Sequence, residues 1–133
     1  MRPEKWEDRL LEEIDRHDKL PFEYGKSDCL TFAVDCAKAI NGKDVMRGKR
    51  KYTNQIGAAK ALKTAGFKDI GDALASMFEE IPPALAGRGD LGVIEGEEAT
   101  VAVVFIGPYA VGKEIPGGVR QVPRSAVSRA FRV

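Results

Sequence analysis

The spacing of apolar residues divides the chain into a helical first half and a strand-rich second half. In the first half, apolar positions recur every three or four residues, which predicts helices. A helix from Glu4 to about Arg16 carries a narrow apolar stripe, made of Trp6, Leu10, Leu11 and Ile14. A second helix, from about Asp28 to Ile40, carries a wider stripe, made of Cys29, Ala33, Cys36 and Ile40 with Phe32 and Ala37 beside it. The narrow stripe predicts a surface helix and the wide stripe a central one.

Two shorter helices are expected before the pattern changes. Thr53 is a suitable N-cap for a helix that runs to about Thr64, and Gly66 ends it. Three alanines of this helix permit close packing, namely Ala58, Ala59 and Ala61. A further helix is expected from Ile70 to Phe78, and Pro82 with Pro83 ends the helical half.

Short apolar segments separated by glycine and proline turns predict strands in the second half. The segment from Thr100 to Ile106 is too apolar to face water on either side. The other expected strands are Leu91 to Ile94, Tyr109 to Gly112, Val119 to Val122 and Phe131 to Val133, with a turn or short helix from Ser125. Helices followed by an antiparallel meander indicate one α+β domain that spans residues 1–133.

The overall charge argues against two classes of partner. The 133 residues include 21 Lys and Arg against 20 Asp and Glu, a net charge of +1. This balance gives no electrostatic case for nucleic acid or an anionic membrane as the main partner. One local basic run, Met46 to Tyr52, is expected to be a solvated loop, with contact to an anionic surface as the alternative.

The sequence predicts neither a membrane-spanning segment nor a signal peptide. No apolar stretch reaches the ~20 residues that span a bilayer, and charges from Arg2 onward leave no signal-peptide core. We therefore expect no membrane insertion and a cytoplasmic location on synthesis. The two cysteines, Cys29 and Cys36, lie two helical turns apart, about 10 Å, which is too far for a disulfide. Both are expected to be reduced, and two cysteines without a nearby histidine make a poor zinc site, so no cofactor is expected.

Cys29 is the strongest candidate for chemistry. A turn-rich stretch from Pro21 to Lys26 leads to Ser27, a good N-cap, and Asp28 is expected in the first helical turn. Free amides and the helix dipole at such a terminus favour the thiolate, which is the nucleophilic form of cysteine. The alternative is that Cys29 is a small buried apolar residue.

The only histidine, His17, falls at the end of the first expected helix. An imidazolium there meets the negative pole of the helix dipole, so His17 is expected to be a helix-end residue. The alternative is that His17 is the base that activates Cys29.

Several short motifs follow one another along the chain. Phe22-x-Tyr24-Gly25-x-x-Asp28-Cys29 opens a helix, Arg88-Gly89-Asp90-Leu91 opens a strand, and an apolar strand ends in Ile106-Gly107. In these features the chain resembles the NlpC/P60 peptidases. It is more closely similar to a small phage-encoded group of NlpC/P60-like proteins. Members of that group show a Pro-Phe-x-x-Gly-x-x-Asp-Cys start, a helix ending in Gly-x-Asp (here Gly42-Lys43-Asp44), a Gly-Phe-x-Asp segment (here Gly66-Phe67-Lys68-Asp69) and a C-terminal aromatic-Arg-Val.

The resemblance implies a papain-like fold, in which N-terminal helices pack on a C-terminal antiparallel sheet and the cysteine begins one of the helices. It implies that Cys29 is the nucleophile and that Asp28 is the acidic residue before it. Tyr24 would be the aromatic residue near the oxyanion site. Gly89-Asp90-Leu91 would open the first strand of the sheet.

One departure from the family pattern bears directly on activity. Active NlpC/P60 enzymes begin the second strand with a general-base histidine, and counting back from Gly107 puts that place at Val101 or Thr100. Neither side chain accepts a proton from a thiol at neutral pH. Asp90 or Glu98 could substitute by position, but a carboxylate with a pKa of about 4 is a weak base for a thiol of about 8.5. Because general-base assistance typically contributes about 10²- to 10⁴-fold, we expect hydrolase activity to be badly impaired or absent.

The resemblance implies a protein of the phage tail tip, beside the baseplate hub, with other tail proteins as partners and the virion tail as its final location. Without a base, we expect it to act through its shape and contacts. The rival hypothesis is an active cysteine peptidase or amidase that cleaves peptidoglycan stem peptides during genome entry, with a base from His17 or another chain. A third is a transferase or thiol-dependent binding module that uses Cys29 without a histidine.

Overall fold

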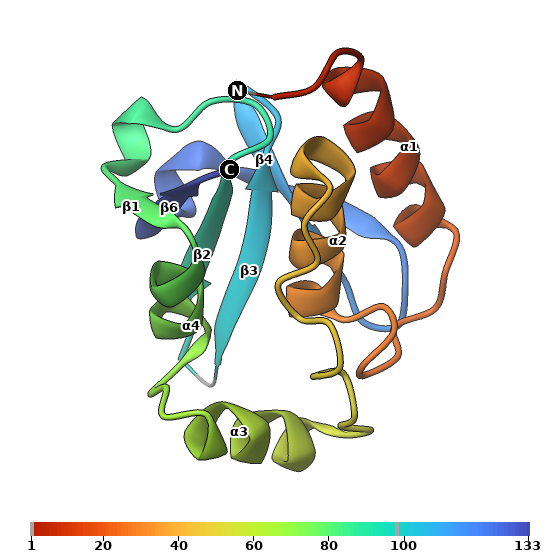
Figure 1. Cartoon of the computed structure of the whole chain (residues 1–133), viewed down its shortest axis with the longest axis vertical. Helices are drawn as coiled ribbons and strands as arrows, with labels where there is room; N and C mark the ends of the chain where they lie inside the picture. Colours follow the sequence, from red (N-terminus) through yellow and green to blue (C-terminus); the bar gives the residue numbers. More distant parts are fainter. Residues whose placement is uncertain (1, 98) are drawn as a thin grey trace.

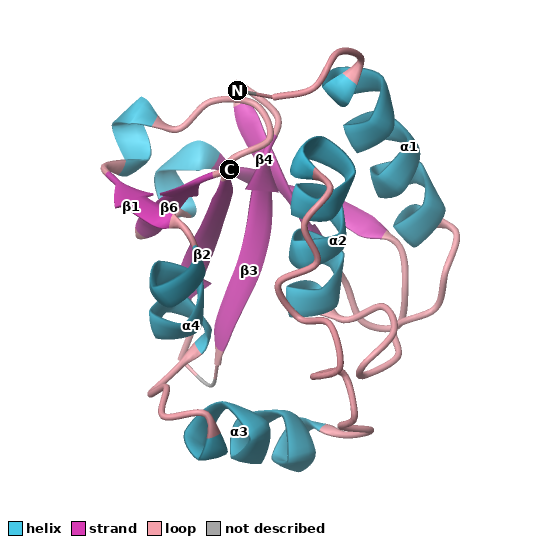
Figure 2. Ribbon diagram, in the orientation of Figure 1, coloured by secondary structure: helices cyan, strands magenta, loops and turns pink. Residues whose placement is uncertain are grey.

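Helices and an antiparallel sheet form the architecture (Figures 1 and 2). The structure is a computed structural model, and it describes residues 2–97 and 99–133. The α-helices of this part of the chain are α1 (Trp6–Asp18), α2 (Cys29–Asn41), α3 (Gln55–Thr64) and α4 (Ile70–Met77). Two short 3-10 helices follow, η1 (Pro83–Leu85) and η2 (Arg124–Ala126). No helix of the described residues combines the length and the apolar character needed to cross a bilayer.

A six-stranded sheet supports the helices, and each strand pairs antiparallel with its neighbours. Its strands are β1 (Glu79–Ile81), β2 (Leu91–Glu95), β3 (Thr100–Phe105), β4 (Tyr109–Lys113), β5 (Val119–Pro123) and β6 (Arg129–Arg132), in the spatial order β1-β6-β2-β3-β4-β5. The α+β prediction is therefore confirmed. Strand β1, which pairs with β6 at the sheet edge, was not predicted.

Helix α2 is the central element, as its wide apolar stripe predicts. It packs on α1 on one side and on β3 and β4 on the other. Eight of its residues are buried, namely Leu30, Thr31, Phe32, Ala33, Val34, Cys36, Ala37 and Ile40. The helix lies between the sheet and α1, and its first residue is Cys29.

The N-cap of α2 is Asp28, and the expectation that Ser27 caps the helix is wrong. The Asp28 carboxylate accepts the backbone N–H of Thr31 at 2.8 Å, while the Thr31 hydroxyl accepts the backbone N–H of Asp28 at 2.9 Å. This reciprocal capping box satisfies two amides at once. The Ser27 hydroxyl is not free to cap, because it hydrogen-bonds His17. Helix α3 likewise begins one residue later than expected, with Asn54 as its N-cap.

Both faces of the sheet are covered by apolar side chains. The larger core lies between helices and sheet, and from β3 it takes Ala102 and Val104. A smaller core lies on the opposite face, made of Ile81, Ala86, Val103, Phe105, Ala110, Val127 and Ala130. Strand β3 is thus buried on both faces, as its continuous apolar run predicts.

Helix α1 packs with only part of its expected stripe. Leu10 is fully buried, whereas Leu11 is 53% exposed, so the prediction that Leu11 joins the apolar stripe is wrong. The two are adjacent in sequence, so they point about 100° apart around the helix axis. The helix also begins later than expected, because Lys5 takes a left-handed backbone conformation (φ 63°) and places Pro3 before the first turn.

Helix α3 stands apart from the rest of the molecule (Figure 1). None of its residues is buried, and Ile56 is 80% exposed. The alanines that permit close packing are not buried in this chain, since Ala58 is half-buried and Ala59 and Ala61 are exposed. The segments on either side of the helix contact the rest of the protein, since Tyr52 before it and Phe67 after it are both partly buried.

The basic run before α3 is only partly the solvated loop that was expected. Met46 is buried, and Arg50 forms ion pairs with Asp35 at 2.7 Å and with Asp44 at 3.2 Å. Tyr52 packs edge-on against Tyr24. The remaining basic side chains of the run are exposed, namely Arg47, Lys49 and Lys51.

Candidate functional site

The loop before α2 is held in place by aromatic contacts and one glycine. Phe22 packs edge-on against Tyr24, with ring centroids 4.9 Å apart. Gly25 has a positive φ of 83°, and a Cβ there would lie 2.7 Å from the carbonyl oxygen of Tyr52 and 2.9 Å from that of Arg50. Glycine is required at this position for both reasons. The close approach brings the segment around Arg50 and Tyr52 against the loop that leads to Cys29.

Asp28 is buried and serves as a clamp between helix and loop. One carboxylate oxygen accepts the Thr31 amide and the other accepts the Gly25 amide, each at 2.8 Å. The phenol of Tyr52 faces the same carboxylate. Burial, and then the charge and hydrogen bonding of Asp28, raise the pKa of Tyr52, which keeps its proton. Asp28 therefore has a structural role beside the thiol.

Cys29 lies at the first position of α2 and is a partly exposed free cysteine. Burial of its sulfur raises the pKa of the thiol to about 11, and the negative charge of Asp28 acts in the same direction. The backbone amides of Ala102, Leu30 and Cys29 itself favour the thiolate but do not offset these effects. The expected thiolate is therefore not the neutral-pH form, since the pKa lies about four units above pH 7. Cys36 is free and fully buried, as a packing residue.

Tyr24 joins Cys29 and Asp28 at this site. Burial raises the pKa of Tyr24, and the proximity of Cys29 and Asp28 raises it further. The three residues taken from the family resemblance therefore lie together. Tyr52, which the sequence did not single out, completes the group, with its ring 6.4 Å from that of Tyr24.

The strand that faces the thiol carries no base. Side chains alternate along a strand, and Ala102 and Val104 lie in the core on the helix side of β3. Val101 pairs with Ile94 and points to the opposite face, away from α2. Thr100 shares the helix-facing side, but Ala102 is the residue whose amide acts on the thiol. Counting the alternation of side chains back from Val104 would have identified Ala102 as a residue on the face of β3 that packs on α2.

His17 is fully buried and does not act on Cys29. Its Nδ1 lies 2.7 Å from the Ser27 hydroxyl oxygen and its Nε2 lies 2.9 Å from a carboxylate oxygen of Asp35. Burial acts to lower the pKa of His17, but hydrogen bonds to Asp35 and Glu13 outweigh it and the pKa is raised. His17 lies in the last turn of α1, as expected, but inside the protein. Since both ring nitrogens are engaged, the geometry does not support His17 as the base for the thiol.

A network of charged side chains surrounds His17. Asp35 of α2 forms ion pairs with His17, with Arg16 of α1 at 3.1 Å and with Arg50 at 2.7 Å. Glu13 forms an ion pair with Arg16, one turn along α1. These interactions connect α1, α2 and the segment before α3. One signal for the network could have been found in the sequence, because Glu13 stands one helical turn before the only histidine.

The network also contains the set of side chains most suited to a metal ion. Ligand atoms of Glu13, His17 and Asp35 lie within 4.8 Å of one another. One imidazole and two carboxylates can bind zinc. Here, however, Arg16 and Arg50 already neutralise the carboxylates. We therefore assign the cluster to ion pairing.

Asp90, considered as a substitute base, has a structural role. One of its oxygens accepts the backbone amide of Gly87 at 2.8 Å, and the other binds Arg2 at 2.9 Å and the backbone amide of Val133 at 3.1 Å. Arg2 also stacks on Trp6, 4.2 Å from the ring centroid. Asp90 thus ties the two ends of the chain to β2. The other substitute, Glu98, lies outside the described residues.

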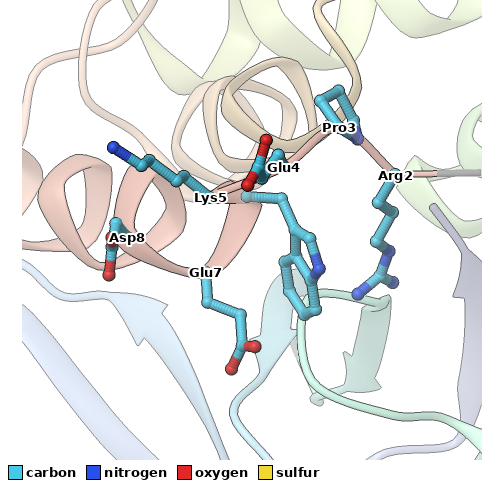
Figure 3. A pocket seen from close by; sticks show the side chains of 7 residues that line it. Arg2, Pro3, Glu4, Lys5, Glu7 and Asp8 are labelled. Atoms are coloured by element: carbon cyan, nitrogen blue, oxygen red, sulfur yellow. The ribbon is translucent and has the colours of Figure 1, made fainter.

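Two surface hollows lie away from Cys29. One, of about 410 Å³, is lined by the consecutive residues Arg2 to Asp8 (Figure 3). The other, of about 510 Å³, lies beside the charged network and is lined by residues that include Glu13, Arg16 and Asp35. Both are wide open to solvent, and neither is lined by Cys29.

Comparison with known proteins identifies a family whose function is unknown. A family model described as a domain of unknown function, DUF6950, matches residues 1–133. The chain therefore belongs to this family. No curated protein matches it.

Proposed function

We propose that this DUF6950 protein is a structural component of a phage tail, built on an NlpC/P60-like, papain-like scaffold and without catalytic turnover. The resemblance of the Phe22-x-Tyr24-Gly25-x-x-Asp28-Cys29 stretch to that family supports the scaffold. The position of Cys29, at the start of a helix that packs on an antiparallel sheet, is compatible with it. By the same resemblance, the protein is made in the host cytoplasm and joins other tail proteins at the tail tip.

The observation that carries the proposal is the state of the Cys29 thiol. Its pKa is raised to about 11 by burial and by Asp28. The only histidine of the chain is held between Ser27 and Asp35, and the β3 residue at the thiol is Ala102. A neutral thiol without a base is a weak nucleophile, which favours a role in packing.

The rival function is a cysteine peptidase or amidase that cleaves peptidoglycan stem peptides. One observation favours it, since the amides of Cys29, Leu30 and Ala102 all act on the sulfur. Amides directed at a reacting centre can stabilise negative charge that develops there. This function would need a base from another chain of the tail.

Replacement of Cys29 in the encoding phage separates the two functions. We expect Cys29→Ala particles to assemble and infect as wild type does, whereas deletion of the gene abolishes tail assembly. The matched control is Cys36→Ala, which removes the other thiol. Normal particles that lose infectivity with Cys29→Ala but not with Cys36→Ala would establish the rival. Intact infectious tails after gene deletion would overturn the tail assignment itself.

A further inference from the structure

Helix α3 leaves an apolar side uncovered by the rest of the chain. It has ten residues, none buried, and Ile56 is 80% exposed. Isolated helices shorter than about 12–15 residues are marginal in water, and most helical stability in proteins comes from packing of an apolar face. Packing of α3 against a second surface would therefore stabilise it.

The exposed face of α3 is positively charged around its apolar centre. Ile56, Ala59, Lys60 and Lys63 are all exposed and stand at the spacing that places residues on one helical face. Between residues 45 and 68 the sequence has seven basic residues and no acidic one. The remainder of the chain consequently carries 14 basic against 20 acidic residues.

Helix α1 presents a face with the opposite charge and the same spacing. Asp8, Leu11, Glu12 and Asp15 are all exposed, and Leu11 is 53% exposed. Exposed residues of both signs flank this face, namely the acidic Glu4, Glu7 and Asp18 and the basic Lys5, Arg9, Arg16 and Lys19. The exposed side chains of this segment therefore number six acidic against four basic. Among the ion pairs of the described residues, none involves Asp8, Glu12, Lys60 or Lys63. Each face thus has an apolar centre and charges available for a partner.

We propose that α3 of one copy of this chain packs on α1 of a second copy. Ile56 and Leu11 form the apolar centre, and Lys60 and Lys63 face Asp8 and Glu12, whereas Asp15 already pairs with Lys19 at 2.8 Å. Helices α1 and α3 lie on different sides of the molecule (Figure 1), so one copy cannot make this contact with itself. The contact joins two different surfaces, and such contacts generate rings or open chains of subunits. The proposal goes beyond the structural role above and does not rest on it.

Charge reversal on each face tests the contact. Variant A carries Lys60→Glu and Lys63→Glu, and variant B carries Asp8→Lys and Glu12→Lys. In either variant alone like charges face each other, and we expect the dissociation constant of self-association to rise at least about tenfold. An equimolar mixture of A and B restores opposite charges at every contact and should associate again. Sedimentation velocity over a range of protein concentrations at low salt measures each case.

Controls separate the contact from general effects of charge and folding. Lys43→Glu with Arg120→Glu changes the net charge as variant A does, but at exposed positions away from α3, and should leave association unchanged. Circular dichroism checks that each variant is folded. Wild-type protein that remains monomeric at every concentration would overturn the proposal, as would association that persists equally in variants A and B. A monomer that binds vesicles of anionic lipid through α3 would also overturn it and assign the helix to a membrane surface.

Discussion

At the scale of single residues, the surroundings of the sulfur set the state of the Cys29 thiol. Cys29 is the first residue of α2, where the helix dipole favours the thiolate. The backbone amide of Ala102, more than 70 positions later in the chain, also acts on the sulfur. The helix dipole acts over the first turn and is worth about 0.3–1 kcal/mol at an exposed site. Burial and the adjacent carboxylate act against it, and they prevail.

The reactivity of Cys29 should follow its raised pKa. In a Cys36→Ala background, we expect the alkylation rate at neutral pH to be low and to rise with pH towards an apparent pKa of about 11. The reason is that only the thiolate reacts, and burial disfavours it. The pH dependence of the alkylation rate of the folded protein measures this. An apparent pKa below the ordinary thiol value of about 8.5 would contradict it.

A histidine introduced on the correct face of β3 should activate the thiol. Ala102→His places an imidazole on the helix-facing side, and its charged form favours the Cys29 thiolate. We expect a lower apparent pKa for alkylation, together with a loss of about 1–3 kcal/mol of stability, because Ala102 is fully buried. Val101→His is the matched control, since Val101 lies on the other face. An equal effect of both substitutions on the Cys29 pKa would contradict the assignment of the two faces.

At the scale of secondary structure, the hydrophobic pattern predicts elements better than their ends or contacts. The helix from about Asp28 to Ile40 and the strand from Thr100 to Ile106 are confirmed with small shifts at their ends. The three-residue strand β1 was missed because only Ile81 of its residues is buried, which leaves no alternating pattern to detect. The wrong N-cap has a local cause, since Ser27 and Asp28 are both good caps. The choice between them depends on the reciprocal bond with Thr31.

Removal of the Asp28 side chain should destabilise the start of α2. Asp28→Ala leaves the amides of Thr31 and Gly25 without their acceptors. We expect a loss of at least about 1–2 kcal/mol in the free energy of unfolding, measured in urea. Asp28→Asn keeps one amide oxygen as an acceptor and should cost less. If the two variants were equally stable, the clamp between helix and loop would not be the source of the effect.

The ion-pair network predicts how the packing of α1 on α2 responds to pH. The pKa of His17 is raised in the folded protein, because hydrogen bonds to Asp35 and Glu13 outweigh burial. A raised folded pKa stabilises the fold fully below the unfolded value of about 6.5, and this contribution is lost as pH rises through the folded pKa. The pKa values of Glu13 and Asp35 are lowered, so their contributions are lost only as pH falls through those lowered values.

Urea unfolding from about pH 5 to about pH 9 compares wild type with His17→Gln across the titration range of histidine. We expect the stability difference between them to be largest at the acidic end of this range and to shrink as pH rises. Glutamine can hydrogen-bond but does not titrate, which makes it the appropriate reference. A difference that grows with pH would contradict the raised pKa of His17.

At the scale of the whole molecule, the chain combines a well-packed body with one helix, α3, that has no buried residue. The α+β class could be predicted from the order of helices and strands, because each pattern is local. The isolation of α3 could not be predicted, because alanines that permit close packing do not require it. The same holds for the charged network, whose members come from α1, α2 and the segment at Arg50. Such features depend on which segments the fold brings together.

Local stability should differ between α2 and α3 in the isolated chain. Amide hydrogen exchange reports local opening, which is easiest where few apolar side chains are buried. We expect the amides of α3 to exchange much faster than those of α2 in dilute protein, because α3 has no buried residue and α2 has eight. If α3 of one copy packs on α1 of another, protection of α3 should rise with protein concentration in wild type but not in the Lys60→Glu, Lys63→Glu variant. Exchange in α3 as slow as in α2 at every concentration would show that the helix is stable without a partner, and would remove the physical reason for the contact.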